Sequence, residues 1–496
     1  MTISNHDFDM TVRGGRISTD SKTFEADIGI KDGVIVCIQK NLPAGRCDID
    51  ATGRWVLPGG IDSHVHIEQR SGMGMMCADD FYSGTVSAAF GGTTTVIPFA
   101  AQHRGKKIPE VIADYAQRAR EKAVIDYGFH LILSDPDEVA LKEDLPKAIR
   151  DGITSLKVYM TYDQLKLSDY QLLDVMALAG TEGALVMIHA ENYDMVRWIA
   201  QRLLDLGKST PKFHAVAHDA LTETEASYRA IVMSRLIDVP VLLVHVGGAE
   251  TVDLIRSAQR LGSKVHAESC PQYMFLTADD IDLPGVEGAQ FCCTPPPGDL
   301  RSQEAVWAGL KDGTLRLYSS DHAPYRMDAS GKLPSGEATT FKQMANGVPG
   351  IELRMPLLFS EGVMTGRITI EEFVALTSTN HARMYGLSHC KGDIAVGMDA
   401  DLALWNPERE VTVDTAMLHD NVGYTPYQGK QLRGWPEVVV SRGRVVVQDN
   451  ALQVERGSGQ YIPRRSPEAT LPAKTAAGAT RLPGMLGLKG KAWPTQ

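Results

Sequence analysis

Six side chains able to bind metal ions follow short apolar runs that are typical of buried β-strands. These residues are His64, His66, Lys157, His189, His245 and Asp321. Neutral imidazole nitrogens and carboxylate oxygens are good ligands for Zn²⁺ and similar divalent ions. Because side chains at the carboxyl ends of parallel strands converge in a closed barrel, the series predicts a site for two metal ions at a barrel rim.

The spacing of the histidines divides them into two groups. Residues two apart in a strand face the same side, so His64 and His66 point together toward one ion, and Asp321 supplies an oxygen beside them. His189 and His245 are candidates for a second ion. A single histidine in an apolar strand is more often a hydrogen-bonded core residue than a ligand, and one HxH pair is weak evidence. The ordered series of six favours a metal site over that core interpretation.

Lys157 is an unusual member of the series, because an ammonium group repels cations. A lysine that is desolvated beside two dications has a depressed pKa. Its neutral amine can add carbon dioxide and become a carbamate, whose two oxygens would bridge both ions. The residue types alone leave open whether Lys157 does this.

The elements that must position these residues alternate between strand-like and helix-like patterns. Eight apolar segments cover residues 61–67, 93–99, 127–133, 153–160, 184–190, 239–246, 263–270 and 315–323. Segments of helical period, such as 106–124 and 249–262, lie between them. Continuous apolar runs are typical of parallel strands that are buried on both faces. The pattern predicts an α/β protein with a (β/α)8 TIM-like barrel over residues 58–384. A doubly wound open sheet is disfavoured, because ligands on five different strands need closure to meet.

The two ends of the chain share a different texture. Residues 1–57 and 385–450 contain short strands joined by turns, and Gly14-Gly15, Asp32-Gly33 and Thr52-Gly53 are typical of hairpins. Neither end has enough strands for a stable sheet. We therefore expect both ends to form one small β-sandwich. Residues 451–496 are rich in Pro, Gly, Ala and basic residues, and predict an extended tail that is a candidate oligomer contact, with Tyr461 through Arg465 docking on a partner subunit.

Composition argues against two classes of partner. The formal net charge is −11 over 496 residues and no basic stretch predicts a nucleic-acid surface. The apolar runs are shorter than the ~20 residues that a membrane span needs. The polar start MTISNHDFDM is unlike a secretory segment, and the seven cysteines lack CxxC spacing. These features predict free thiols and a cytoplasmic protein.

From about residue 10 to 460 the chain resembles the hydantoinase and dihydropyrimidinase branch of the amidohydrolase superfamily. The motifs PGGIDSHVHIE, GITSLKVYMTY, HAEN, CPQYMFLT, SSDHAP, NGVPGIELR and KGDIAVGMDADLALW carry the resemblance. It implies that His64, His66 and Asp321 bind one metal ion, that His189 and His245 bind the other, and that N6-carboxylated Lys157 bridges them. It also implies two divalent ions, expected to be Zn²⁺, and a homo-oligomer, either a dimer or a tetramer.

The implied reaction is the opening of a cyclic amide or imide by metal-hydroxide attack, which gives an N-carbamoyl amino acid from a hydantoin or dihydropyrimidine. Asp321 would act as general base and then general acid. Tyr162 would donate to the oxyanion, and the backbone groups of Thr294 and Asn346 would hold the substrate ring. Tyr162 has an alternative interpretation as a packing aromatic, and Asn346 as a turn residue before Gly347.

Some positions depart from the family pattern. Ala323 stands where many hydantoinases have Cys, and Tyr159, on the same strand face as Lys157, stands where relatives often have Phe. The methionines Met73, Met75 and Met76 are either an adaptable apolar lid or packed residues.

Three other functions stay open at this point. One is an allantoinase or dihydroorotase, although dihydroorotases usually carry Arg two residues after the second His, where this chain has Glu68. Another is an imide hydrolase. A non-catalytic scaffold is disfavoured, because such relatives have lost ligands and all six are present here.

Overall fold

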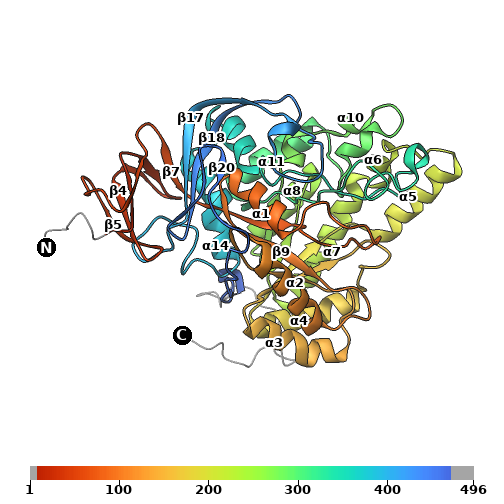
Figure 1. Ribbon diagram of the computed structural model, residues 1–496. Coiled ribbons are helices and arrows are strands. Elements are labelled where there is room, and N and C mark those ends of the chain that lie inside the picture. Colours follow the sequence, from red (N-terminus) through yellow and green to blue (C-terminus); the bar gives the residue numbers. More distant parts are fainter. Residues whose placement is uncertain (1–7, 471–496) are drawn as a thin grey trace.

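A parallel barrel forms the larger part of the computed structural model, which describes residues 8–470 (Figure 1). Its strands are β8 (Gly60–Val65), β9 (Thr93–Ala101), β10 (Asp126–Tyr127), β11 (His130–Ile132), β12 (Ser155–Tyr159), β13 (Leu185–His189), β14 (Val241–Leu243), β15 (Val265–Ser269) and β16 (Leu317–Tyr318). Strands β10 and β11 pair with successive parts of β9 and share one position, which makes the barrel eight-stranded. A parallel bridge between Val65 and His322 links the last position to the first. The predicted barrel is confirmed, and each strand overlaps one of the eight predicted segments, with β8, β9 and β10 extending one or two residues beyond them.

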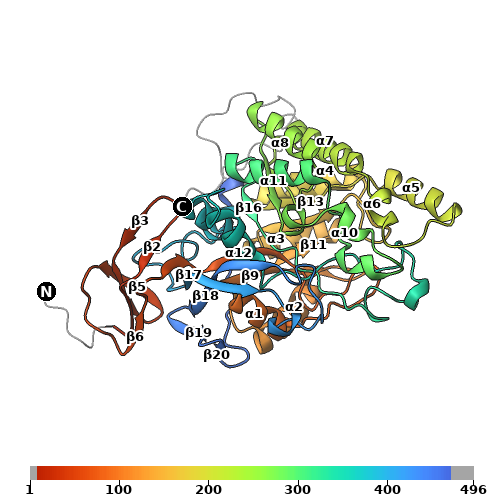
Figure 2. The ribbon, with the colours of Figure 1, turned by 90° about the horizontal axis from the view of Figure 1, so that it is seen from above.

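Helices lie around the strands, as the view from above shows (Figure 2). They are α1 (Phe81–Phe90), α2 (Ile108–Lys122), α3 (Leu145–Arg150), α4 (Asp169–Glu182), α5 (Tyr193–Asp205), α6 (Phe213–Ala217), α7 (Ala220–Ile237), α8 (Ala249–Arg260), α9 (Gln272–Phe275), α10 (Ala278–Ile281), α11 (Leu300–Asp312), α12 (Arg354–Leu358), α13 (Ile370–Val374) and α14 (Asn380–Met384). Helix α2 buries Ile108, Val111, Tyr115 and Ala119, which recur at helical spacing. Helices α2 and α8 fall within the two segments predicted from helical period.

Two sheets from the chain ends form the second part. One has the order β5 (Val34–Gln39), β4 (Asp27–Lys31), β1 (Met10–Arg13), β6 (Cys47–Asp50). The other has the order β20 (Ala451–Leu452), β19 (Arg444–Gln448), β18 (Gln431–Ser441), β17 (Leu402–Thr412), β7 (Trp55–Pro58), β2 (Arg16–Ser18), β3 (Thr23–Glu25). Strand β7 pairs antiparallel with β17, so the two ends of the chain lie side by side (Figure 1). Apolar residues of both sheets share one core, as expected of a sandwich.

The turns of this sandwich differ from the prediction at two places. Asp32-Gly33 closes the hairpin between β4 and β5, as expected. Gly14-Gly15 and Thr52-Gly53 do not close hairpins. Each lies where the chain crosses from one sheet to the other, because β1 and β6 belong to the four-stranded sheet while β2 and β7 belong to the larger one. A tight turn therefore joins strands that are not paired with each other.

The segment after the sandwich packs on the barrel of its own chain. Tyr461 forms a bridge with Tyr127, and the Ile462 N–H donates to the Tyr127 carbonyl at 2.8 Å. The buried Arg464 donates to Ser155 Oγ at 2.7 Å and to the Phe129 carbonyl, at the amino ends of the strands. Tyr461, Ile462 and Arg464 therefore pack within their own chain, and a contact of this segment with a partner subunit stays a prediction. The rest of the predicted tail, residues 471–496, lies outside the described residues.

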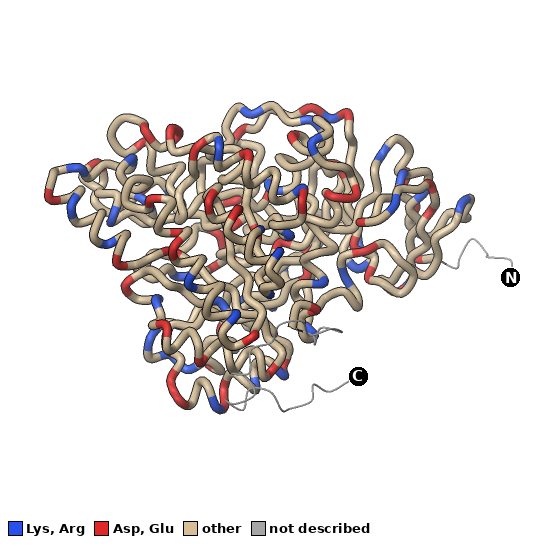
Figure 3. The backbone as a smooth tube through the Cα atoms, turned by 180° about the vertical axis from the view of Figure 1, so that it is seen from behind, with Lys and Arg blue, Asp and Glu red and all other residues tan. Residues whose placement is uncertain are grey.

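A buried charge network joins the barrel to the sandwich. Lys391 Nζ lies 2.6 Å from Asp126 Oδ2 and 2.7 Å from Asp401 Oδ2, and Arg442 Nε lies 2.9 Å from the same oxygen of Asp126. Elsewhere, acidic and basic residues are interspersed over the described backbone (Figure 3). Among the helices of residues 8–470, none combines the length and the apolar character that crossing a bilayer requires.

Candidate metal centre

A cavity of about 430 Å³ opens at the carboxyl ends of the barrel strands. All nine residues that the sequence predicts for the site line it, namely His64, His66, Lys157, Tyr162, His189, His245, Thr294, Asp321 and Asn346. Tyr159 also lines it, as its position on the strand face of Lys157 predicts. Barrel closure is what gathers them, since they come from strands and loops that are far apart in sequence.

The first group of candidate ligands consists of His64, His66 and Asp321. The Nε2 atoms of His64 and His66 lie 3.2 and 3.3 Å from Asp321 Oδ1. The opposite nitrogens are held by other side chains: His64 Nδ1 contacts Glu268 Oε1, and His66 Nδ1 lies 2.8 Å from Gln69 Oε1. Both Nε2 atoms therefore face the Asp321 carboxylate and are free to act as ligands.

The second group lies beside it. His189 Nδ1 is 2.9 Å from His245 Nε2, while His189 Nε2 lies 2.6 Å from Glu191 Oε2. Burial lowers the pKa of His64 and His245 well below the usual histidine range, and lowers that of His189. Neutral imidazoles are the form that metal ions bind.

Lys157 reaches the site from β12 with its side chain fully buried. Its Nζ has no hydrogen-bond partner among the described residues and lies 5.4 Å from the ring centre of Phe99. Burial lowers the pKa of Lys157 to about 8, although the carboxylates of Glu268 and Asp321 oppose that shift. The neutral amine that carbamate formation needs is therefore more populated near neutral pH than in an ordinary lysine.

The buried polar atoms without partners test whether divalent ions fit. Within residues 8–470, His64 Nε2 and Lys157 Nζ are buried and have no hydrogen-bond partner. Ligand atoms of His64, His245 and Asp321 lie within 4.8 Å of one another. Unpaired buried polar atoms are costly, and nitrogen and oxygen donors at this spacing suit a divalent ion. The donor set therefore fits metal ions.

The backbone at three site residues is in the left-handed region, where side chains other than glycine are rare. Tyr162, His245 and Asp321 have φ of 73°, 40° and 48°. Such conformations persist where the surroundings over-determine them, and they cluster at functional sites. Each lies just beyond a barrel strand, so the unusual φ turns the chain at the point where the side chain enters the cavity.

Two loop segments, around Thr294 and Asn346, also line the cavity, and the buried Lys332 hydrogen-bonds to both. Thr294 Oγ1 lies 3.2 Å from His214 Nε2, and Asn346 Oδ1 is unpaired among the described residues. Lys332 Nζ donates to the carbonyls of Cys292 at 2.8 Å and Ala345 at 3.2 Å, next to both segments. Sequence reasoning missed Lys332, because nothing in a polar loop distinguishes a lysine that folds inward.

The loop that contains Met73, Met75 and Met76 fits both earlier interpretations in part, an apolar lid and packed residues. Met73 lines the cavity and is 48% exposed, whereas Met75 packs against Cys77, Ala323 and Tyr325. Met76 is also exposed but does not line the cavity. One methionine therefore lies at the cavity mouth and another is packed.

Glu68, at the position discussed for dihydroorotases, turns away from the cavity. Its carboxylate lies 2.7 Å from Lys122 Nζ on α2.

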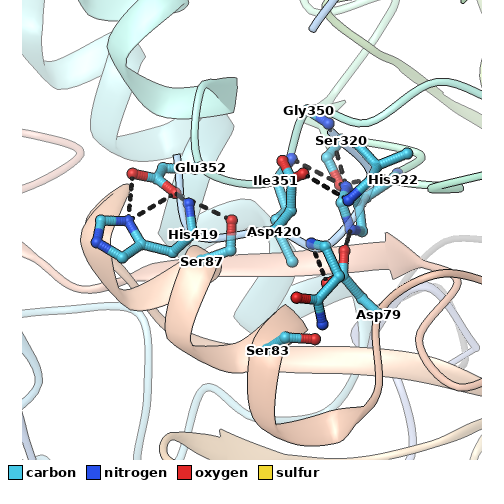
Figure 4. Close-up of polar contacts among 12 residues, drawn as sticks. Asp79, Ser83, Ser87, Ser320, His322, Gly350, Ile351, Glu352, His419 and Asp420 are labelled. Atoms are coloured by element: carbon cyan, nitrogen blue, oxygen red, sulfur yellow. Dashed lines mark hydrogen bonds and ion pairs between the residues drawn. The ribbon is translucent and has the colours of Figure 1, made fainter. Parts of the chain in front are cut away.

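A second polar cluster surrounds His322, the residue after Asp321 (Figure 4). His322 Nε2 donates to Asp79 at 3.0 Å, and His322 Nδ1 accepts from the Gly350 N–H at 3.1 Å. Asp420 lies nearby, and burial together with the charge of Asp79 raises the pKa of Asp420 to about 6. The bonds of His322 fix the chain directly after Asp321.

The sequence analysis also missed two buried carboxylates, Glu191 and Glu268. Glu268 lies inside the apolar segment 263–270 and Glu191 follows His189 by two residues. A charged residue within or next to a buried strand was the available signal, since such residues are almost never fully buried unless paired.

Comparisons with known proteins bear on these observations together. The model of the amidohydrolase family matches residues 55–446. D-hydantoinase from Rhizobium radiobacter is 38% identical over 459 residues, which cover 92% of this chain and 99% of that protein. D-hydantoinase from Geobacillus stearothermophilus is 40% identical over 456 residues, covering 91% and 96%. The crystal structure of dihydropyrimidinase from Brevibacillus agri NCHU1002 is similar with a TM-score of 0.89 at 39% identity, covering 92% of this chain and 99% of that one.

Proposed function

Because the chain belongs to the amidohydrolase family and is a cyclic amidohydrolase, we propose that it opens a hydantoin or dihydropyrimidine ring in the cavity at the barrel rim. The product would be an N-carbamoyl amino acid. The observation that carries the proposal is the convergence of six ligand side chains in one cavity of about 430 Å³.

We assign two divalent ions to this cavity, with Zn²⁺ as the proposed metal. His64, His66 and Asp321 would hold one, His189 and His245 the other, and carboxylated Lys157 would bridge them. When bound, such ions lower the pKa of water toward ~7 and so supply hydroxide at neutral pH.

The remaining chemistry falls to side chains of the chain itself. Asp321 accepts a proton from the attacking water and returns it to the leaving ring nitrogen. Tyr162 is a neutral donor at the site, because burial raises the pKa of its hydroxyl well above the usual range. That hydroxyl donates to the oxygen on which charge develops, while Thr294 and Asn346 orient the ring.

The ring-opening assay tests this function directly. Zinc-loaded protein would be offered dihydrouracil, hydantoin, 5-phenylhydantoin, succinimide, phthalimide, allantoin and dihydroorotate, with ring opening followed by ultraviolet absorbance. Turnover of dihydrouracil, hydantoin or 5-phenylhydantoin supports the proposal, and turnover of only allantoin, dihydroorotate or an imide would replace it. Dihydroorotate is disfavoured because Glu68 pairs with Lys122 and presents no cation to a substrate carboxylate.

Lys157→Ala tests the bridging role. We expect this variant to lose at least one metal ion and nearly all turnover, as measured by elemental analysis and the same assay. Full metal content and an unchanged rate would contradict the carbamate proposal.

We also propose that the protein is a homo-oligomer with a cytoplasmic location. The mass of the native particle in solution tests the oligomeric state.

A further inference from the structure

Two fully buried carboxylates lie behind the predicted metal ligands, one behind each group. Glu268 on β15 contacts His64 Nδ1 through Oε1, and its Oε2 accepts from Ser319 Oγ at 2.8 Å. Glu191 lies 2.6 Å from His189 Nε2 through Oε2, and its Oε1 lies 2.7 Å from His218 Nδ1. Both carboxylates therefore use one oxygen for a ligand histidine and the other for an anchoring side chain.

These contacts decide which histidine nitrogen carries the proton. An ionised carboxylate accepts hydrogen bonds and donates none, so the nitrogen that faces it must be an N–H. Burial raises the pKa of Glu268 to about 8, so in the metal-free chain this condition holds for Glu268 only at higher pH, and bound cations would favour its ionised form. The other nitrogen then presents its lone pair, which is His64 Nε2 toward Asp321 and His189 Nδ1 toward His245. A carboxylate in this position also raises the basicity of the histidine as a ligand.

The other two histidines lack such support. His66 Nδ1 faces the neutral amide oxygen of Gln69, and His245 Nδ1 has no hydrogen-bond partner among residues 8–470. Each group of ligands therefore contains one histidine that is backed by a carboxylate and one that is not.

We infer that Glu268 and Glu191 are positioning residues that serve the two metal ions separately, Glu268 the ion held by His64, His66 and Asp321, and Glu191 the ion held by His189 and His245. The inference rests on the proposed binuclear site and adds the two residues that set the metal affinity of each ion position independently.

The test uses Glu268→Gln and Glu191→Gln, which keep the size of the side chain and remove its charge. Competition between each variant and a chelator for Co²⁺ would measure two dissociation constants. Reference absorption spectra come from His66→Ala and His245→Ala, which perturb the first and the second position. We expect Glu268→Gln to weaken the first position 10- to 100-fold and Glu191→Gln to weaken the second by a similar factor, each with a smaller effect on the other position.

A second measurement separates positioning from a merely structural role. Nitrogen-15 NMR of the metal-free protein at a pH well above 8, where Glu268 is ionised, reports histidine tautomers. A glutamine, unlike an ionised carboxylate, can either accept from the imidazole or donate to it. We therefore expect His64 in Glu268→Gln, and His189 in Glu191→Gln, to change from one tautomer to a mixture while the thermal midpoint of the metal-free protein stays constant.

Several results would overturn the inference. Equal weakening of both positions by either substitution would do so, as would unchanged affinities and tautomers. If a glutamine variant does not fold, Ser319→Ala and His218→Ala remove the anchors of Glu268 and Glu191, and the same position-specific loss is expected. If the unsubstituted protein binds fewer than two ions, the binuclear proposal fails first. Two bound ions with unaffected variants would refute only the positioning roles.

Discussion

Replacing Tyr162 by phenylalanine removes one hydroxyl from the cavity and separates two roles that the structure allows for it. The hydroxyl of Tyr162 is hydrogen-bonded to the side chain of Thr294, and the centre of its ring lies 5.9 Å from that of Tyr159. Phenylalanine keeps the ring and its packing. The substitution therefore reports only on what the hydroxyl does.

The two roles differ in magnitude. If the hydroxyl contributes only its neutral hydrogen bond to Thr294, its loss costs about 0.5–1.5 kcal/mol, which corresponds to about tenfold or less in rate. If it donates to the developing oxyanion, its loss costs about 2.7–4 kcal/mol, or 10²- to 10³-fold in kcat. We expect the larger loss, with little change in KM, because the interaction strengthens only in the transition state.

Steady-state ring opening of zinc-loaded Tyr162→Phe measures this effect. Tyr159→Phe is the matched control, since it removes a phenol from the same cavity wall without an assigned role, and we expect its kcat to stay within about fivefold of the parent value. A kcat for Tyr162→Phe that is unchanged, or equal to that of the control, would refute the oxyanion role and make Tyr162 a packing residue. Metal content of both variants must match the parent for the comparison to hold.

Three further predictions test the surroundings of the site. Lys332→Met should raise KM about tenfold or more with two ions still bound, because two charged hydrogen bonds behind Thr294 and Asn346 are lost; an unchanged KM would contradict this. Asp420 has a folded pKa raised from 3.8 to about 6, so the stability it contributes is present below pH ~4 and lost as pH rises through about 6; Asp420→Asn should therefore exceed the parent in urea stability by at most about 3 kcal/mol at pH 8 and match it near pH 4. Lys391→Met should lower the free energy of unfolding by about 3–5 kcal/mol by leaving buried carboxylates uncompensated, whereas Lys142→Met, at an exposed ion pair, should leave it nearly unchanged.

Much of the barrel could be predicted because its signals are local. A parallel strand that is buried on both faces must be apolar along its length, so β9 and β13 are recognisable without knowledge of their neighbours. Helix α2 is equally readable from its apolar spacing. The same locality makes candidate ligands visible, because each follows such a run at a strand end.

The sandwich and the last described segment were harder to predict. Gly14-Gly15 has the local chemistry of a hairpin, yet β1 pairs with β4 and β6 while β2 pairs with β3 and β7. Strand pairing is decided by which edges meet, and turn residues alone do not specify that. Sequence alone places Arg464 in the tail, but its two terminal guanidinium nitrogens bond to Ser155 and Phe129 of the barrel, more than three hundred residues earlier in the chain.

Local sequence patterns were thus enough to identify the candidate metal ligands, the strand ends on which they lie, and the barrel class that could gather them. Which atoms face one another could not be predicted in this way: His64 and Glu268 are 204 residues apart, and nothing local relates them. Periodicity and propensity act over a few residues, whereas hydrogen-bond partners, burial and the resulting shift in the pKa of Lys157 depend on closure of the whole barrel.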